Sequence, residues 1–360
     1  MSMVVRAFWL ILCAAGLALG TGCAKKVDRV TVDRIIARGM AYEDIDRLCA
    51  VGDALGIPMA GLGISQNALK AQVLANVSAA LCLEPVVREA QIDGAIARRV
   101  LSGEQKVAAV LDARYREERA HTRAAYRYKQ AWDALEAEYG PIGEACPRIR
   151  DADQLVFLMG LYAGLHGMLH DQAGGGHVGV SFDTLGKVAR GTACIDNERL
   201  WHVPGAFKAA AWATLLYEDE GDPWAMLEAE AAAGEASGVR LARAVQVMIL
   251  ANADRTDALR DALQAHARSL EQTPTAPEWA AMDQYALDVS RHELDRLWAA
   301  AEGHRAPSFG ALPGGAEEAG EGNGPFAADP FAGGDPFGGG EEATDGAEGS
   351  GDDAPPDSEE

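Results

Sequence analysis

The chain contains 360 residues, of which 32 are Lys or Arg and 54 are Asp or Glu, so its formal net charge is −22. Its composition, 48% apolar and 24% charged, is that of a globular protein rather than a disordered one. So acidic a chain is not expected to bind nucleic acid, because contacts with phosphates need a basic surface.

Residues 1–22 have the pattern of a bacterial secretion signal. Arg6 is their only charged residue, and the apolar run from Phe8 to Leu19 is shorter than the roughly 20 residues that span a bilayer. Small residues then precede Cys23, as in a bacterial lipobox, which predicts acylation of Cys23 and anchoring without a spanning helix. Ala24, where the inner-membrane pattern has Asp, favours the periplasmic face of the outer membrane. The alternative is an ordinary signal peptide with an incidental cysteine.

Residues 23–304 are rich in Ala, Leu, Arg and Glu, and their apolar residues recur with a helical period. Helices are predicted at 28–55, 65–83, 86–101, 104–139, 152–171, 204–219, 223–236, 239–252, 255–271 and 276–302. Gly56-Ile57-Pro58 and Gly140-Pro141 are interpreted as helix ends, and Asp222-Pro223 as a helix start. Apart from a short extended stretch at 178–182, nothing alternates as a strand would, so the predicted fold class is all-α.

Four cysteines remain in these residues besides Cys23, and an even number in an oxidising compartment suggests two disulfides. Of the three connectivities, sequence order favours Cys49–Cys82 with Cys146–Cys194. Four buried free thiols are the alternative. A zinc ribbon is excluded because the sequence has no C-x-x-C.

The predicted helix 104–139 carries two contrasting faces. One stripe collects the large apolar residues of the segment together with one threonine: Val107, Leu111, Tyr115, Thr122, Tyr126, Trp132, Leu135 and Tyr139. The other face is rich in Arg, which predicts either a solvated surface paired with acidic neighbours or a surface that contacts anions.

Residues 206–271 suggest a repeat, because apolar positions recur at an offset of 33 residues. A helix pair repeating at this period is typical of tetratricopeptide arrays. Each pair leaves one apolar face open, and stacking the next pair buries it, so we expect stacked helical hairpins with a concave binding surface.

His166 and His170 are four residues apart on a predicted helix, so both rings face one side. This is a spacing found in metal sites, with His177, Asp171 or His202 as candidate third ligands. A hydrolytic zinc helix would have Glu after the first His, where this chain has Gly167. Gly164 and Gly167 instead suggest close helix packing, with ordinary structural histidines as the alternative to a metal.

Residues 305–360 form a distinct segment with fourteen acidic residues and one basic residue, in a background rich in Gly and Pro. We expect this tail to be disordered, because it cannot bury enough apolar area to offset chain entropy. Its three Pro-Phe pairs, Pro325-Phe326, Pro330-Phe331 and Pro336-Phe337, are either docking points for a partner or low-complexity drift.

In order, these features resemble the T component of TRAP transporters. The resemblance rests on the lipobox, the Tyr- and Arg-rich helix ending at Tyr139-Gly140, the pattern Phe157-x-x-Gly160-x-Tyr162-x-Gly164, Ala211-Trp212, and Arg291-x-x-Leu294-x-x-Leu297. It implies a tetratricopeptide-like periplasmic lipoprotein, assembled as a trimer and associated with a periplasmic solute-binding protein. It also implies a ligand groove near Tyr162, Trp201 and Trp212. The acidic tail and the extra cysteines depart from this pattern.

The sequence therefore predicts a non-catalytic binding or scaffold lipoprotein of the cell envelope, without a cofactor and accessory to a solute transporter. Two other hypotheses stay open at this point. One is a metal-dependent envelope hydrolase centred on His166 and His170, and the other is a structural lipoprotein whose tail docks a partner.

Overall fold

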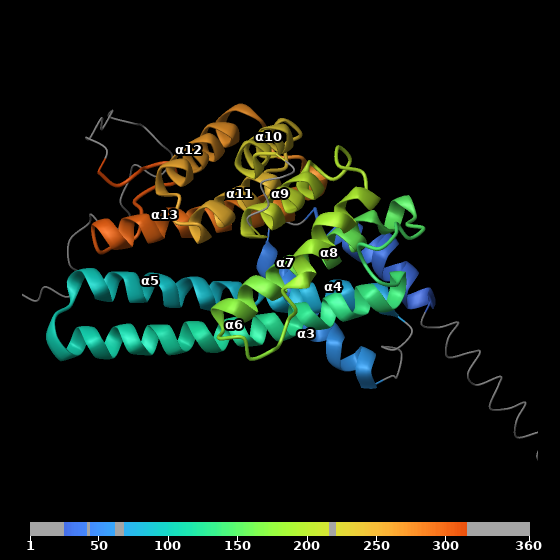
Figure 1. The fold of residues 1–360 in the computed structure, drawn as a ribbon, viewed down its shortest axis with the longest axis horizontal. Coiled ribbons are helices and arrows are strands. Elements are labelled where there is room, and N and C mark those ends of the chain that lie inside the picture. The colour runs from blue at the N-terminus through green and yellow to red at the C-terminus, as the bar shows by residue number, and fades with distance from the viewer. Residues whose placement is uncertain (1–24, 42–43, 62–67, 216–220, 315–360) are drawn as a thin grey trace, which may run out of the picture. The chain divides into compact units, whose positions relative to one another are not determined.

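The computed structural model describes residues 25–41, 44–61, 68–215 and 221–314 (Figure 1). All regular elements there are helical, so the all-α prediction is confirmed. The signal segment, Cys23 and the Pro-Phe pairs lie outside the described residues. Within the described part, no helix is both long and apolar enough to cross a bilayer.

The elements in chain order are a π-helical turn Thr31–Ile36, α2 Ala37–Gly39, α3 Ile45–Gly61, α4 Leu69–Leu81, α5 Glu84–Val100, α6 Gly103–Tyr139, α7 Gln154–Ala173, α8 Asp183–Gly191, α9 Val203–Leu215, α10 Pro223–Ala236, α11 Leu241–Asn252, α12 Thr256–Gln272 and α13 Ala280–Ala301.

The long helix α6 is the centre of the N-terminal half, where it packs against α4, α5 and α7. Helices α5 and α6 run side by side as a hairpin (Figure 1). In the C-terminal half, α9, α10, α11 and α12 each pack against the next helix along the chain, and α13 returns to pack against α11 and α5.

Glycines on α7 allow it to approach α6 closely. A Cβ at Gly164 would lie 2.5 Å from Cε3 of Trp132, and one at Gly167 would lie 3.3 Å from the Cβ of Tyr128. Both partners are buried residues of α6. The close packing predicted for Gly164 and Gly167 is therefore confirmed, and it places one face of α7 directly against α6.

The apolar stripe predicted on α6 is buried only at its C-terminal end. Trp132 and Leu135 are in the core, whereas Val107 is 59% exposed and Tyr126 is 57% exposed. The core face instead consists largely of alanines: Ala113, Ala120, Ala124, Ala125, Ala131 and Ala134. Three other helices pack closely against α6, so its core face has room only for small side chains. The size of a side chain, more than its hydrophobicity, therefore decides which residues of α6 face the core.

Three local predictions need correction. Helix α3 continues through the expected stop at Gly56-Ile57-Pro58 as far as Gly61, with the loss of the one backbone hydrogen bond that a proline cannot donate. Helix α8 was not predicted, since it is only nine residues long and forms around two buried side chains, Leu185 and Val188. The stretch at 178–182 is a loop without strand pairing.

The described body extends to Gly314, past the tail boundary predicted at residue 305. Phe309 and Leu312 pack against the apolar cluster formed by α11, α12 and α13. The indole nitrogen of Trp298 donates a hydrogen bond to the carbonyl oxygen of Ala311 at 2.7 Å. Single apolar residues in a Gly- and Pro-rich background carry no periodicity, so the sequence alone did not reveal these contacts.

Two disulfides are present, and they join the cysteines that sequence order favoured. Cys49 of α3 is bonded to Cys82, with 5.0 Å between their Cα atoms. Cys146, in the segment after α6, is bonded to Cys194, with a Cα–Cα distance of 5.2 Å. Each bond closes a connection between neighbouring parts of the helical body.

Candidate functional site

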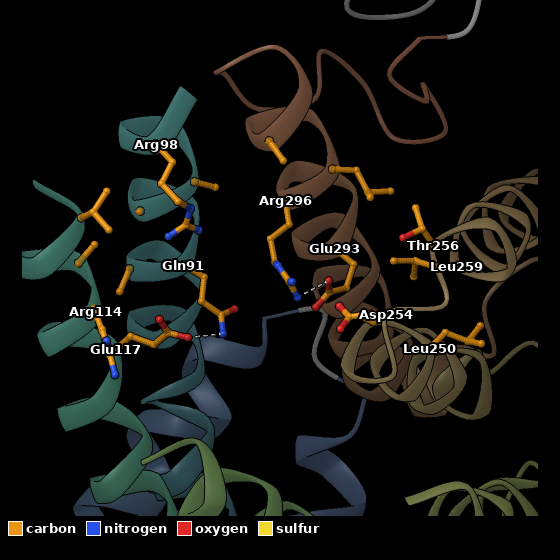
Figure 2. Close-up of a pocket in the computed structure, with 18 of the residues that line it drawn as sticks. Gln91, Arg98, Arg114, Glu117, Leu250, Asp254, Thr256, Leu259, Glu293 and Arg296 are labelled. Atoms are coloured by element: carbon orange, nitrogen blue, oxygen red, sulfur yellow. Dashed lines mark hydrogen bonds and ion pairs between the residues drawn. The ribbon is translucent and has the colours of Figure 1, made fainter. Parts of the chain in front are cut away.

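A cleft of about 570 Å³ lies between helices α5 and α6 on one side and α11, α12 and α13 on the other. Gln91 on α5 and Arg296 on α13 project into the space between these helices (Figure 2). Four arginines but only three acidic residues line the cleft, in a protein that is otherwise strongly acidic. They are Arg98, Arg114, Arg255 and Arg296, with Glu117, Asp254 and Glu293.

A smaller cavity of about 170 Å³, which we call the chamber, adjoins the cleft. The two share four lining residues, Gln91, Glu117, Glu293 and Arg296. The chamber extends inward between α5, α6, α7 and α13, and its wall carries four histidines, namely His121, His166, His170 and His292. Such a concentration of polar side chains in the interior of a helical protein demands specific partners for each group.

Glu84, the first residue of α5, is the hub of these contacts. Its Oε1 lies 3.0 Å from Nε2 of His170 and 3.8 Å from Nδ1 of His166, and it accepts a hydrogen bond of 2.9 Å from the hydroxyl of Tyr128. Burial alone would raise the pKa of Glu84, but the neighbouring His170, His166 and Arg88 hold it well below the usual value. Glu84 is therefore an ionised carboxylate inside the protein.

The histidines around Glu84 have further partners within the fold. Nδ1 of His170 lies 2.8 Å from Nδ1 of His121. The ring of Tyr162 stacks on His166 with 3.8 Å between centroids, and its hydroxyl lies 2.5 Å from that of Tyr285. Burial lowers the pKa of His166, so its imidazole is neutral and one ring nitrogen carries a free lone pair.

Arg88, one turn after Glu84 on α5, also lines the chamber, and its side chain is only 15% exposed. Its guanidinium lies 3.9 Å from Oε2 of Glu84 and 5.5 Å from the ring centroid of Tyr285. Among the described residues, no group accepts a hydrogen bond from it within normal distance. Arg88 is thus a nearly buried cation whose hydrogen-bond donors are available to a ligand.

The structure brings His166 and His170 together as predicted, but none of the three expected third ligands joins them. Asp171 accepts hydrogen bonds from the backbone amides of the following loop, His202 pairs with Glu230 at 2.8 Å, and His177 is largely exposed beside Glu118. Closeness in sequence thus does not bring these side chains into one group. Glu84 occupies the position instead, 86 residues before His170, and no sequence signal marked it.

The aromatic residues expected to form a ligand groove have separate neighbours. Tyr162 is buried behind His166, at the edge of the chamber. Trp201 packs on Trp279 with ring centroids 4.5 Å apart, and Trp212 lies beneath the ammonium of Lys208. Other residues line the cleft and the chamber, so a ligand groove formed by these three aromatic residues stays a prediction.

Comparisons of the chain with family models, with curated proteins and with solved structures found no match.

Proposed function

We propose that the protein is a non-catalytic binding component of the bacterial cell envelope, anchored through Cys23, that holds a small anionic ligand of the carboxylate class in the chamber. In this role it serves as an accessory to a solute transporter and meets a periplasmic solute-binding protein. The observation that carries the proposal is the nearly buried Arg88, whose guanidinium has no hydrogen-bond acceptor among the described residues.

A guanidinium presents a rigid fork of N–H donors that matches the two oxygens of a carboxylate. The carboxylate nearest to Arg88 is that of Glu84, which already accepts a hydrogen bond from Tyr128 and lies 3.0 Å from Nε2 of His170. Asp288 on α13 acts on Arg88 from farther away, through its charge. At 3.9 Å, the closest approach of Glu84 to Arg88 is too long for a good hydrogen bond. A small anion in the chamber would complete the coordination of Arg88 without displacing any existing contact.

The outer cleft supports the same class of ligand. Arg98 and Arg114 line it, and neither has an acidic partner within ion-pair distance among the described residues. At the boundary between cleft and chamber, Glu293 is paired with Arg296 at 2.8 Å, and burial raises the pKa of its carboxyl. Four arginines against three carboxylates give the lining of the cleft a slight excess of positive charge, which favours an anion over a cation at its mouth. In an acidic protein, this local excess of arginine gives an anion a favourable path inward.

Placement in the envelope is supported by the signal-like segment and by the two disulfides, which persist in oxidising compartments. The transporter partner and trimeric assembly are proposed from the resemblance to TRAP T components. Replacing Cys23 with Ser tests the anchor. We expect the variant to leave the membrane fraction, and a variant that still sediments with membranes would refute the lipid anchor.

The ligand is tested with the purified mature chain, using mass spectrometry of released small molecules and calorimetric titration with acetate and succinate. We expect Arg88→Met to weaken carboxylate binding by about 10- to 100-fold, the usual effect of losing a hydrogen bond to a charged group. Arg116→Met is the matched control, because Arg116 lies outside both cavities and pairs with Asp93 and Asp112.

Thermal unfolding of each variant separates loss of binding from loss of folding. Arg88→Lys, which keeps the charge and removes the fork, is expected to bind with intermediate affinity. Equal carboxylate affinity in wild type and a folded Arg88→Met variant would refute the proposal, and so would a wild-type chain that binds neither probe and releases no anion. Capture from envelope extract, with identification of bound proteins, tests the transporter role. Recovery of a solute-binding protein is the expected result.

A further inference from the structure

The inner wall of the chamber has a second feature, which does not depend on an anion at Arg88. One carboxylate oxygen and two imidazole nitrogens converge there: Oε1 of Glu84, Nδ1 of His166 and Nε2 of His170. A suitable ligand atom from each of the three buried side chains lies within 4.8 Å of the other two. They come from two helices, α5 and α7, whose packing through α6 is fixed by the core.

The contact between His121 and His170 limits the tautomers that this group can adopt. Because their Nδ1 atoms are 2.8 Å apart, one ring must donate a proton and the other must accept it. If His170 donates, its Nε2 carries a lone pair that points at the carboxylate of Glu84, only 3.0 Å away. Two acceptors at this distance repel each other unless a cation lies between them.

The opposite tautomers place the unpaired lone pair on His121 instead of His170. If His121 donates, its own Nε2 carries the lone pair, and this atom is buried without a hydrogen-bond partner among the described residues. The nearest acidic oxygen, Oε1 of Glu117, is 3.6 Å away and is also an acceptor. A neutral pair therefore always turns one lone pair toward a carboxylate, and a cation, either a proton on one ring or a metal ion, removes that repulsion.

We propose that Glu84, His166 and His170 form a binding site for a divalent transition-metal ion of the zinc class. Two imidazoles and one carboxylate are a donor set that suits Zn²⁺, and ligand atoms about 2.1 Å from a tetrahedral ion lie about 3.4 Å from one another. The observed separations of 3.0 Å and 3.8 Å from Glu84 to the two histidines bracket this value. When His170 donates to His121, an ion between Nε2 of His170 and the carboxylate of Glu84 removes the repulsion between these two acceptors.

His121 then acts as a positioning residue. A metal-bound histidine usually gives its second ring N–H to a nearby acceptor, which fixes its tautomer and orientation. Nδ1 of His121 is that acceptor for His170. Three protein ligands leave a fourth position on the ion for water or an anion, as in open zinc sites.

The site is tested with the purified full mature chain, by titrating Zn²⁺ alone against a chromophoric chelator. We expect one equivalent per chain. Glu84→Gln should lower the affinity by more than about 100-fold, and His121→Asn by about 10- to 100-fold, as is usual for the partner of a ligand. His177→Gln is the control, since His177 is exposed and lies away from the cluster, and it should bind like wild type.

X-ray absorption of the zinc-loaded wild type gives an answer that does not depend on the folding of any variant. Two imidazole nitrogens and a carboxylate oxygen at about 2.0 to 2.2 Å are expected. Absence of stoichiometric binding, a first shell without imidazole, or unchanged affinity in a folded Glu84→Gln variant would each overturn the site. A chain that binds zinc but no carboxylate keeps this site and refutes the proposed function, whereas carboxylate binding without zinc does the reverse.

Discussion

Replacing Gly164 with Ala tests the close approach of α7 to α6, on which the position of both ligand histidines depends. In the interior of a helix, Gly→Ala by itself stabilises by about 1 kcal/mol. At this position the new Cβ would lie 2.5 Å from Cε3 of Trp132 and 2.9 Å from Cγ2 of Val188. Overpacking of a core typically costs about 1 to 3 kcal/mol. Because both partners are well-packed side chains, we expect the upper part of that range and a net loss of about 2 kcal/mol.

Urea unfolding followed by circular dichroism measures this change in the free energy of unfolding. Gly186→Ala on α8 is the matched control, because the atom nearest to its new Cβ is the end of the flexible Arg190 side chain, 3.3 Å away. We expect this control to gain up to about 1 kcal/mol. Adding Trp132→Leu to Gly164→Ala should restore part of the loss by making room for the methyl group.

The reasoning fails if Gly164→Ala is as stable as wild type while Gly186→Ala behaves as expected. In that case the two helices would be farther apart than the core packing requires. The same result would remove the physical basis for the placement of His166 and His170 against Glu84.

Two further perturbations test other parts of the fold. Burial, together with the charges of Arg240 and Arg243, lowers the pKa of His266 from 6.5 to about 3, so the unfolded chain takes up this proton first as the pH falls. The neutral His266 therefore contributes fully to the free energy of unfolding above about pH 6.5, and this contribution is lost progressively toward pH 3. At about pH 5 the loss amounts to about 2 kcal/mol. The urea midpoints measured near pH 6.5 and near pH 3 should differ less in His266→Gln than in wild type. An unchanged difference would contradict the lowered pKa of His266. Removing the Cys146–Cys194 bond, which closes a separation of 48 residues, should cost about 4 kcal/mol in the chain-entropy model. The double Ala variant is compared with wild type under oxidising and reducing conditions, and a variant as stable as the oxidised wild type would show that the bond contributes nothing.

Much of the helical architecture could be predicted from the sequence, because the signals for it are local. Helical periodicity located most helices, and the cap at Asp222 was recognised from its position before Pro223; its carboxylate accepts a hydrogen bond from the amide of Trp224. The spacing of His166 and His170 placed both rings on one side of α7. Each of these inferences depends on residues within about one helical turn of one another.

The sequence by itself therefore determined that the described part of the chain is helical, and that two histidines share a face. Only the tertiary structure decided that Glu84 completes their group, that α6 turns its alanines inward, and that Phe309 anchors the segment after α13. These outcomes depend on partners far away in sequence, since burial and ionisation are set by whatever packs opposite a residue. The residues of a single helix do not specify which residues will pack against it, because that is decided only when the whole core assembles.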